Sequence, residues 1–186
     1  IGRDPFCRDV AAIYPMLADN RTWLLAADFD EGKWSLDVTA FCKCCREMVL
    51  APAVERSRSG NGAHVCFFFS EPVSAADARR LGTGLLTRTM AHRHELSFAS
   101  YDRLFPSQDI VPKGGFGNLI ALPFPGQAQK DGNSLFVDDD FVPYPDQWAF
   151  LSSLPKITPE QLEECLQKLC RNGDMGELAD AAEEPV

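Results

Sequence analysis

The sequence predicts an α+β fold built on a βαββαβ unit that covers about residues 22–104. Short apolar runs bounded by charged or turn residues predict strands, and longer segments with an apolar residue every three or four positions predict helices. Over this range the two patterns follow the order strand, helix, strand, strand, helix, strand. That order is typical of ferredoxin-like and RNA-recognition folds.

The elements of this unit can be placed one by one. Strands are predicted at residues 23–29, 53–57, 63–69 and about 98–104. The first helix is expected to be capped by Ser35, with an apolar face formed by Val38, Phe41, Cys42, Cys45, Met48 and Val49. The second helix is expected to run from Ser74, which forms a capping-box pattern with Asp77, to about Met90.

Additional α/β elements are expected on both sides of the unit. A helix is predicted from Asp4-Pro5, with an apolar stripe of Val10, Ile13, Tyr14 and Leu17. After the unit come short strands at 118–122 and 134–137 and a final helix from Thr158-Pro159 to near Gly173. We therefore expect residues 1–173 to form one domain, followed by an acidic tail or linker over residues 174–186.

The composition fits a globular domain in a reducing compartment. The chain has 186 residues, 45% of them apolar, which is enough for a substantial core. No apolar run approaches the ~20 residues that span a bilayer, and no signal-peptide pattern is present, so no membrane association is expected. Seven cysteines without a disulfide-framework spacing favour the cytoplasm. Since the chain begins at Ile1 and ends in acidic residues, we expect it to be part of a longer protein.

The net charge of −9 is unevenly distributed. Basic side chains outnumber acidic ones only in residues 54–115, by eight to six. A locally basic segment is what a phosphate-binding surface requires, although a solvated surface of mixed charge has the same composition.

The predicted strand order brings three polar features together. In the usual order of this unit, the first strand lies between the third and the fourth, antiparallel to both. The end of the first strand, with Asp28 and Asp30, then lies beside His64 at the start of the third. Asp102, near the start of the fourth strand, is expected at the same end of the sheet.

Each of these features has an ordinary explanation as well. Residues two apart on a strand share a face, so the Asp28 and Asp30 carboxylates repel unless a cation lies between them, but a solvated turn also contains such pairs. The glycine-rich loop at 59–62 before His64 can bring backbone amides close to phosphate, but it is also a common hairpin connection. Asp109 competes with Asp102 for the place of the third acid.

The three features also form an ordered set of motifs. In chain order they are Asp28-Phe29-Asp30, Gly62-Ala63-His64 and Tyr101-Asp102. This set resembles the archaeo-eukaryotic primase superfamily, with its Asp-x-Asp/Glu, small-x-His and hydrophobic-Asp motifs. The longer segments 26–30, 56–64, 101–109 and 114–119 are similar to the primase domain of bacterial TOTE conflict systems and to CRISPR-associated primase-polymerases. The resemblance covers roughly residues 8–154.

The resemblance implies a DNA primase-polymerase catalytic core that transfers nucleotides from NTP or dNTP to a 3′-hydroxyl with two Mg²⁺ or Mn²⁺ ions. It implies that Asp28, Asp30 and Asp102 are catalytic metal ligands and that His64 contacts the triphosphate. Further candidates for phosphate contacts are Ser59, Arg58, Lys113 and Gln108. The implied partners are a single-stranded DNA template and a helicase module, in DNA replication or a conflict system.

Two departures from the family pattern stand out. Many relatives have serine two residues before the motif histidine, where this chain has Gly62. That change removes a hydroxyl that could contact phosphate. Tyr101 is also less purely hydrophobic than the third motif prefers.

The cysteines are interpreted as core residues. Cys42 and Cys45 have the spacing of metal ligands, but they fall on the predicted buried face of a helix, and no second tight pair exists. We therefore expect no zinc within this fragment.

Two other functions remain open on the sequence. A two-metal phosphodiesterase or nuclease uses similar acid clusters, although a histidine after a glycine loop suits a triphosphate better than a water nucleophile. A non-catalytic nucleic-acid-binding domain of the RNA-recognition class would need stacking aromatic residues on its central strands, where this chain has acids.

Overall fold

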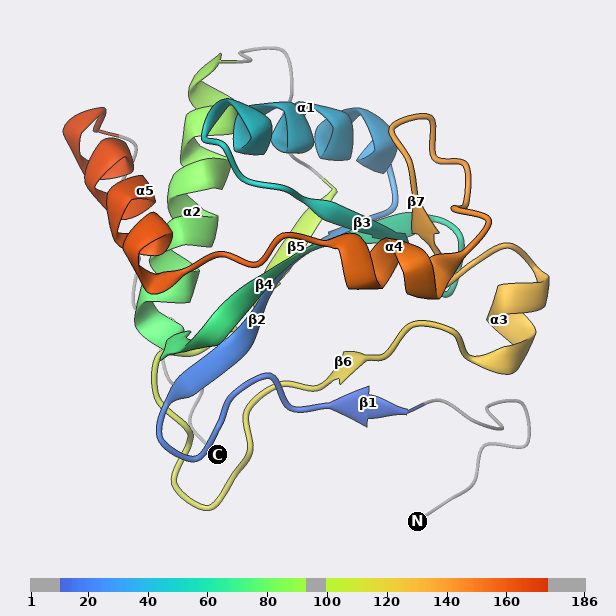
Figure 1. The fold of residues 1–186 in the computed structure, drawn as a ribbon. Helices are drawn as coiled ribbons and strands as arrows, with labels where there is room; N and C mark the ends of the chain where they lie inside the picture. Colours follow the sequence, from blue (N-terminus) through green and yellow to red (C-terminus); the bar gives the residue numbers. More distant parts are fainter. Residues whose placement is uncertain (1–10, 93–99, 174–186) are drawn as a thin grey trace.

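A five-stranded antiparallel sheet forms the centre of the computed structural model, which describes residues 11–92 and 100–173 (Figure 1). The strand order is β5-β2-β4-β3-β7. The strands are β2 (Arg21–Asp30), β3 (Ala53–Arg56), β4 (Gly62–Ser74), β5 (Tyr101–Phe105) and β7 (Phe136–Val137). The predicted α+β class and the order of the four strands of the βαββαβ unit are therefore confirmed, and β7 extends the sheet beyond β3.

Three helices cover one face of this sheet: α1 (Trp34–Glu47), α2 (Ala75–His92) and α5 (Pro159–Arg171). The apolar stripe of α1 is buried against the strands, as its spacing predicts, but the prediction is wrong for Val49, which lies beyond the end of the helix and is exposed. The helix α2 has glycines where neighbouring elements approach it closely. A Cβ at Gly84 would lie 2.8 Å from a methyl group of Leu169, which allows α5 to pack tightly against α2.

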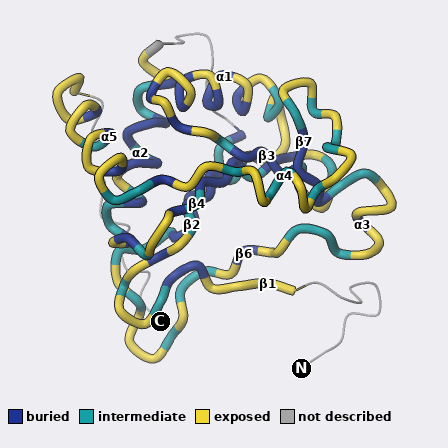
Figure 2. The backbone as a smooth tube through the Cα atoms, in the orientation of Figure 1, coloured by how far each residue is buried: buried dark blue, intermediate teal, exposed yellow. Residues whose placement is uncertain are grey.

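The opposite face carries a second, smaller apolar cluster. It contains Ala26, Ala53, Cys66, Phe105, Ile120 and Phe136. The helix α4 (Gln147–Ser153) packs on it through Phe150 and Leu151, and α3 (Gly126–Lys130) precedes β7 in the chain. Beside it lies a two-stranded sheet of β1 (Ala12–Ile13) and β6 (Ile120–Ala121). Figure 2 shows the centre of the main sheet, around β3 and β4, mostly buried, whereas β1 is exposed.

The expected first helix is wrong over its described part. Ala12 and Ile13 form a strand that pairs with Ala121 and Ile120. The cause lies in Pro15, which cannot donate a helical hydrogen bond and disfavours the helical conformation in the residue before it. The expected start of this helix, at residues 4–10, lies outside the described residues, as do the tail at 174–186 and residues 98–99 of the predicted fourth strand.

Helix ends agree with the sequence at two of three positions. Thr158 caps α5 with a complete capping box, and Ser74 Oγ accepts a hydrogen bond from the Asp77 amide at the start of α2. Ser35, by contrast, is not the cap of α1, because the helix begins one residue earlier and Lys33 occupies that position. No helix in the described part of the chain has the length and apolar character needed to cross a membrane.

Candidate active site

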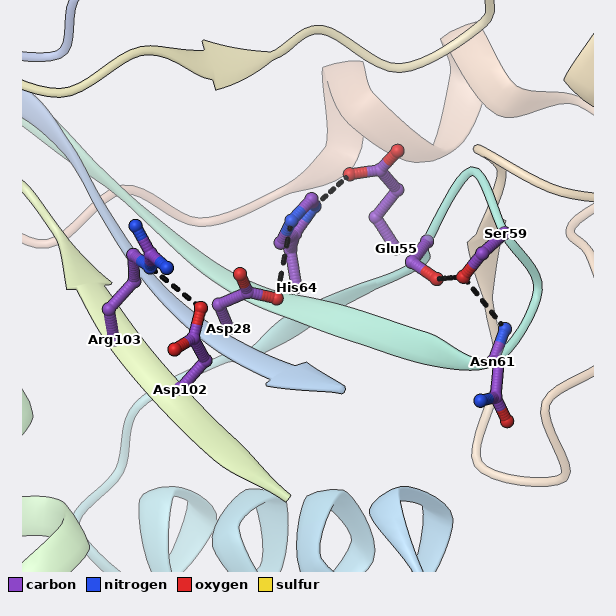
Figure 3. A network of polar contacts seen from close by, with 8 residues as sticks. Asp28, Glu55, Ser59, Asn61, His64, Asp102 and Arg103 are labelled. Atoms are coloured by element: carbon purple, nitrogen blue, oxygen red, sulfur yellow. Dashed lines mark hydrogen bonds and ion pairs between the residues drawn. The ribbon is translucent and has the colours of Figure 1, made fainter. Parts of the chain in front are cut away.

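A row of polar side chains crosses four adjacent strands on the face of the sheet opposite α1 and α2 (Figure 3). Asp28 on β2 pairs with His64 on β4 and with Arg103 on β5, and His64 also pairs with Glu55 on β3. Residues directly opposite each other in antiparallel strands share a face. The neighbours of Asp28 in β2 belong to the helix-side core, so the row points the other way.

The Asp28 carboxyl group lies in an environment that opposes its charge. Burial raises its pKa above the ordinary aspartate value, and the negative charges of Asp102 and Asp30 raise it further, while His64 and Arg103 act in the opposite direction. The side chain is 18% exposed. A cation placed among these three acids would relieve the repulsion between them.

Asp30 owes its position to two close backbone contacts. Its amide donates a hydrogen bond to the Ser100 carbonyl over 2.7 Å, and the hydroxyl of Ser100 is bound in turn to buried Asp37 at the start of α1. On the other side, Gly62 pairs with Asp30 in β4. A Cβ at Gly62 would lie 2.7 Å from Asp30 Oδ1 and 2.4 Å from the Phe29 carbonyl, so only glycine fits.

Asp102 reaches the same face through a bulge in β5. Asp28 pairs with Arg103 while the next residue, Phe29, pairs with Tyr101, so Asp102 is an extra residue opposite β2. Tyr101 therefore packs into the helix-side core, and Asp102 is free to bind Arg103, with Nε 2.7 Å from Oδ2. Figure 3 shows this pair beside Asp28.

Asp109 lies elsewhere. Its carboxylate forms an ion pair with Arg79 of α2, the helix that packs on the other face of the sheet. Of these two acids, Asp102 is the one whose negative charge raises the pKa of Asp28.

The His64 ring is held between two carboxylates. Its Nδ1 lies 2.9 Å from Glu55 Oε2, and its Nε2 lies 3.5 Å from Asp28 Oδ1. Burial alone would lower the pKa of His64, but the hydrogen bond and charge of Glu55, together with Asp28 and Asp30, outweigh it and raise the pKa. The surrounding carboxylates therefore stabilise the protonated ring, and a protonated ring can donate from both nitrogens to oxygen atoms.

Glu55 is the site residue that the sequence analysis missed. Glu55 belongs to the predicted strand at 53–57, which precedes the glycine-rich loop, and the β-hairpin register places it opposite His64. That register was the available signal, because a hairpin with a known loop specifies which residues face each other.

The remaining candidates for phosphate contacts lie in loop segments, outside the row of polar side chains on the strands. Ser59, in the loop before β4, binds the Asn61 amide through its Oγ and makes a contact with Ser57. The Arg58 side chain is exposed in the same loop. Lys113 is exposed in the segment between β5 and β6, and Gln108 lies in that segment with its carboxamide oxygen buried against Gly117.

The three acids have the oxygen-donor chemistry that Mg²⁺ and Mn²⁺ prefer. Within residues 11–92 and 100–173, however, no three His, Cys, Asp or Glu side chains are already gathered around one ion position. The Asp102 carboxylate is instead paired with Arg103. The residues present fit a divalent ion in charge and donor type.

The cysteines of α1 lie in the core, as predicted. Cys42 and Cys45 are buried, and burial raises the pKa of Cys42 to about 12. Both pack with the helix-side cluster.

Comparison with known proteins decides the family. The family model of the archaeo-eukaryotic primase domain of TOTE conflict systems matches residues 6–165. The chain belongs to this family. The resemblance of the three motifs is therefore confirmed, and the primase domain described here contains them on a single sheet.

Solved structures add a more distant likeness. The polymerase domain of Ligase D from Mycobacterium tuberculosis, in complex with DNA, is 18% identical, with a TM-score of 0.36. The match covers 84% of this chain and 53% of that polymerase-domain chain, so it spans about half the length of the latter. No curated protein matches the sequence.

Proposed function

We propose that this primase domain is a template-dependent nucleotidyltransferase that adds nucleotides from NTP or dNTP to a 3′-hydroxyl. The proposal depends on the row of polar side chains on one face of the sheet. In this row Asp28 lies beside His64, and the negative charges of Asp102 and Asp30 raise the pKa of Asp28. A cluster of acids next to a histidine that can donate a hydrogen bond to a phosphate oxygen matches a substrate that combines divalent metal with a triphosphate.

Asp28, Asp30 and Asp102 would hold Mg²⁺ or Mn²⁺. When bound, such ions activate the attacking hydroxyl and stabilise the pyrophosphate leaving group. The raised pKa of Asp28 supports this assignment, because the cost of keeping these acids charged together disappears once a cation neutralises them. The β2–β4 and β2–β5 pairings place the three acids at one end of the sheet, and binding of an ion by Asp102 would compete with its pairing to Arg103.

His64 would bind the triphosphate. Its Nε2 faces the acids, and its Nδ1 is held by Glu55. Arg103, once it leaves Asp102, is a second cation on the same face. The loop residues Ser59 and Arg58 lie just before the strand that carries His64, and with Lys113 and Gln108 they are proposed as secondary phosphate contacts.

The template would be single-stranded DNA, with a helicase module supplying it. Both partners are proposed from membership of a conflict-system primase family. A cytoplasmic location is proposed as well, because the seven cysteines lack the spacing of a disulfide framework.

Primer extension tests this function. A labelled primer on a single-stranded template should be extended by the wild-type chain with Mg²⁺ or Mn²⁺, and Asp28→Ala or Asp30→Ala should abolish extension. These variants should unfold no more easily than the wild type, because they remove acids that repel each other.

Asp109→Ala is the matched control, since it removes an acid that is paired with α2 on the other side of the sheet. It should retain activity, whereas Asp102→Ala should lose it. Near wild-type extension by the Asp28→Ala/Asp30→Ala double variant would rule out this site, and cleavage of the template without extension would favour a nuclease.

A further inference from the structure

We propose that Glu55 is a positioning residue that holds the His64 ring in the orientation required to bind the triphosphate. The inference rests on the proposed function and goes beyond it, because Glu55 belongs to none of the three family motifs. It follows from where Glu55 lies, what it contacts and what its burial costs.

Glu55 is a buried carboxylate in an apolar setting. The residue is 4% exposed and lies in β3, between β4 and β7. Its paired residue on β7 is Phe136, which belongs to the apolar cluster on this face. A carboxylate in such a place is costly, and an apolar side chain of similar size would serve packing as well or better.

What Glu55 provides is a fixed partner for one nitrogen of the histidine. Oε2 lies 2.9 Å from His64 Nδ1, a normal hydrogen-bond length. The contact to Asp28 at Nε2, at 3.5 Å, is longer than a good hydrogen bond. The ring is therefore anchored at Nδ1, and Nε2 remains available for a phosphate oxygen.

A second contact restricts the ring from its face. Phe105, on β5, meets His64 edge to face with the ring centroids 6.5 Å apart. The terminal torsion of histidine is otherwise broad and roughly two-fold, so an unanchored ring can turn its nitrogens away. Carboxylates that hold the far nitrogen of a functional histidine orient it in the same way in metal and hydrolase sites.

The test compares two substitutions of Glu55 in the full chain. Glu55→Gln keeps an oxygen that can accept from Nδ1, whereas Glu55→Leu keeps the volume and removes the acceptor. Labelled nucleoside triphosphate is titrated against wild type, both variants, His64→Ala and the Glu55→Leu/His64→Ala double variant. Thermal unfolding of each variant checks that the fold is retained.

We expect Glu55→Leu to weaken nucleotide binding about tenfold or more, and Glu55→Gln to retain most of the affinity. In the His64→Ala background, Glu55→Leu should have no further effect, because its action passes through His64. A purely structural role would give the same loss in both backgrounds, which would overturn the inference, as would wild-type affinity in Glu55→Leu.

Histidine NMR gives a readout independent of nucleotide. With ¹⁵N-labelled histidine, the Nδ1 proton of His64 should be protected in wild type and in Glu55→Gln but lost in Glu55→Leu. An unchanged signal in Glu55→Leu would contradict the anchoring. If wild type binds no nucleotide at all, the proposed function fails, whereas nucleotide binding that ignores Glu55 overturns only this inference.

Discussion

Replacement of Gly62 by alanine should damage both the fold and the site. A Cβ at this position would lie 2.4 Å from the backbone oxygen of Phe29 and 2.7 Å from Asp30 Oδ1. Ordinary contacts begin near 3.4 Å, so β2 and β4 would have to separate by about 1 Å at this pair. The first obstacle is the Phe29 carbonyl, which is backbone at the end of the β2–β4 ladder and yields less easily than a side chain.

The expected cost follows from this overlap. Overpacking in a well-ordered region typically costs about 1–3 kcal/mol, and we expect Gly62→Ala to lose stability in that range. Because Asp30 pairs with Gly62, the same shift should move the Asp30 carboxylate away from Asp28 and weaken Mn²⁺ binding.

Urea unfolding measures the first effect and electron paramagnetic resonance of added Mn²⁺ the second. Gly126→Ala is the matched control, since this glycine opens α3 and an added Cβ would meet no atom within 4 Å. Alanine favours a helix by up to about 1 kcal/mol over glycine, so the control should be neutral or stabilised. If Gly62→Ala is as stable as wild type and binds Mn²⁺ as tightly, the close approach of β2 and β4 is wrong.

Three further results are expected. His64→Ala should weaken binding of labelled nucleotide by about 1–3 kcal/mol and leave binding of labelled single strand nearly unchanged, whereas equal losses would indicate a structural histidine. Thr158→Ala should lower the free energy of unfolding by about 1 kcal/mol, because it removes the capping box of α5; an unchanged value in urea unfolding would show that this cap contributes nothing. In a Cys7→Ser background, Cys170 should react first with a thiol reagent because it is exposed. Cys42 is buried and has a pKa of about 12, so it should react only on unfolding, and its rapid modification would contradict its burial.

The βαββαβ unit could be predicted because its signals are local. The apolar runs of β2 and β4 and the amphipathic spacing of α1 are readable without any long-range information. The usual arrangement of this unit then predicts the strand order and places Asp28 beside His64, as the structure has them.

Other features depend on contacts that periodicity does not record. The bulge that sets Asp102 beside Arg103 is a one-residue insertion, visible only when β5 is aligned on β2. Only the register of β3 against β4 places Glu55 opposite His64 and therefore in the site. β1 was mistaken for a helix because an apolar spacing was given more weight than Pro15.

Helix α4 was missed because its signal is short. Asp146 caps it, with Oδ1 accepting from the Ala149 amide, but the helix is a seven-residue segment within a proline-rich region. Its burial of Phe150 against the second apolar cluster is a tertiary contact, and such contacts decide whether short helices form.

The most direct test of nucleotidyl transfer at this site is an anomalous diffraction map of crystals soaked with Mn²⁺ and a nucleoside triphosphate. We expect manganese peaks within about 2.0–2.6 Å of carboxylate oxygens of Asp28, Asp30 and Asp102, with Arg103 released from Asp102. The triphosphate should lie within hydrogen-bond distance of His64 Nε2. Manganese bound at Asp109 or elsewhere, with Asp102 still paired to Arg103 and no triphosphate at His64, would contradict the proposed site.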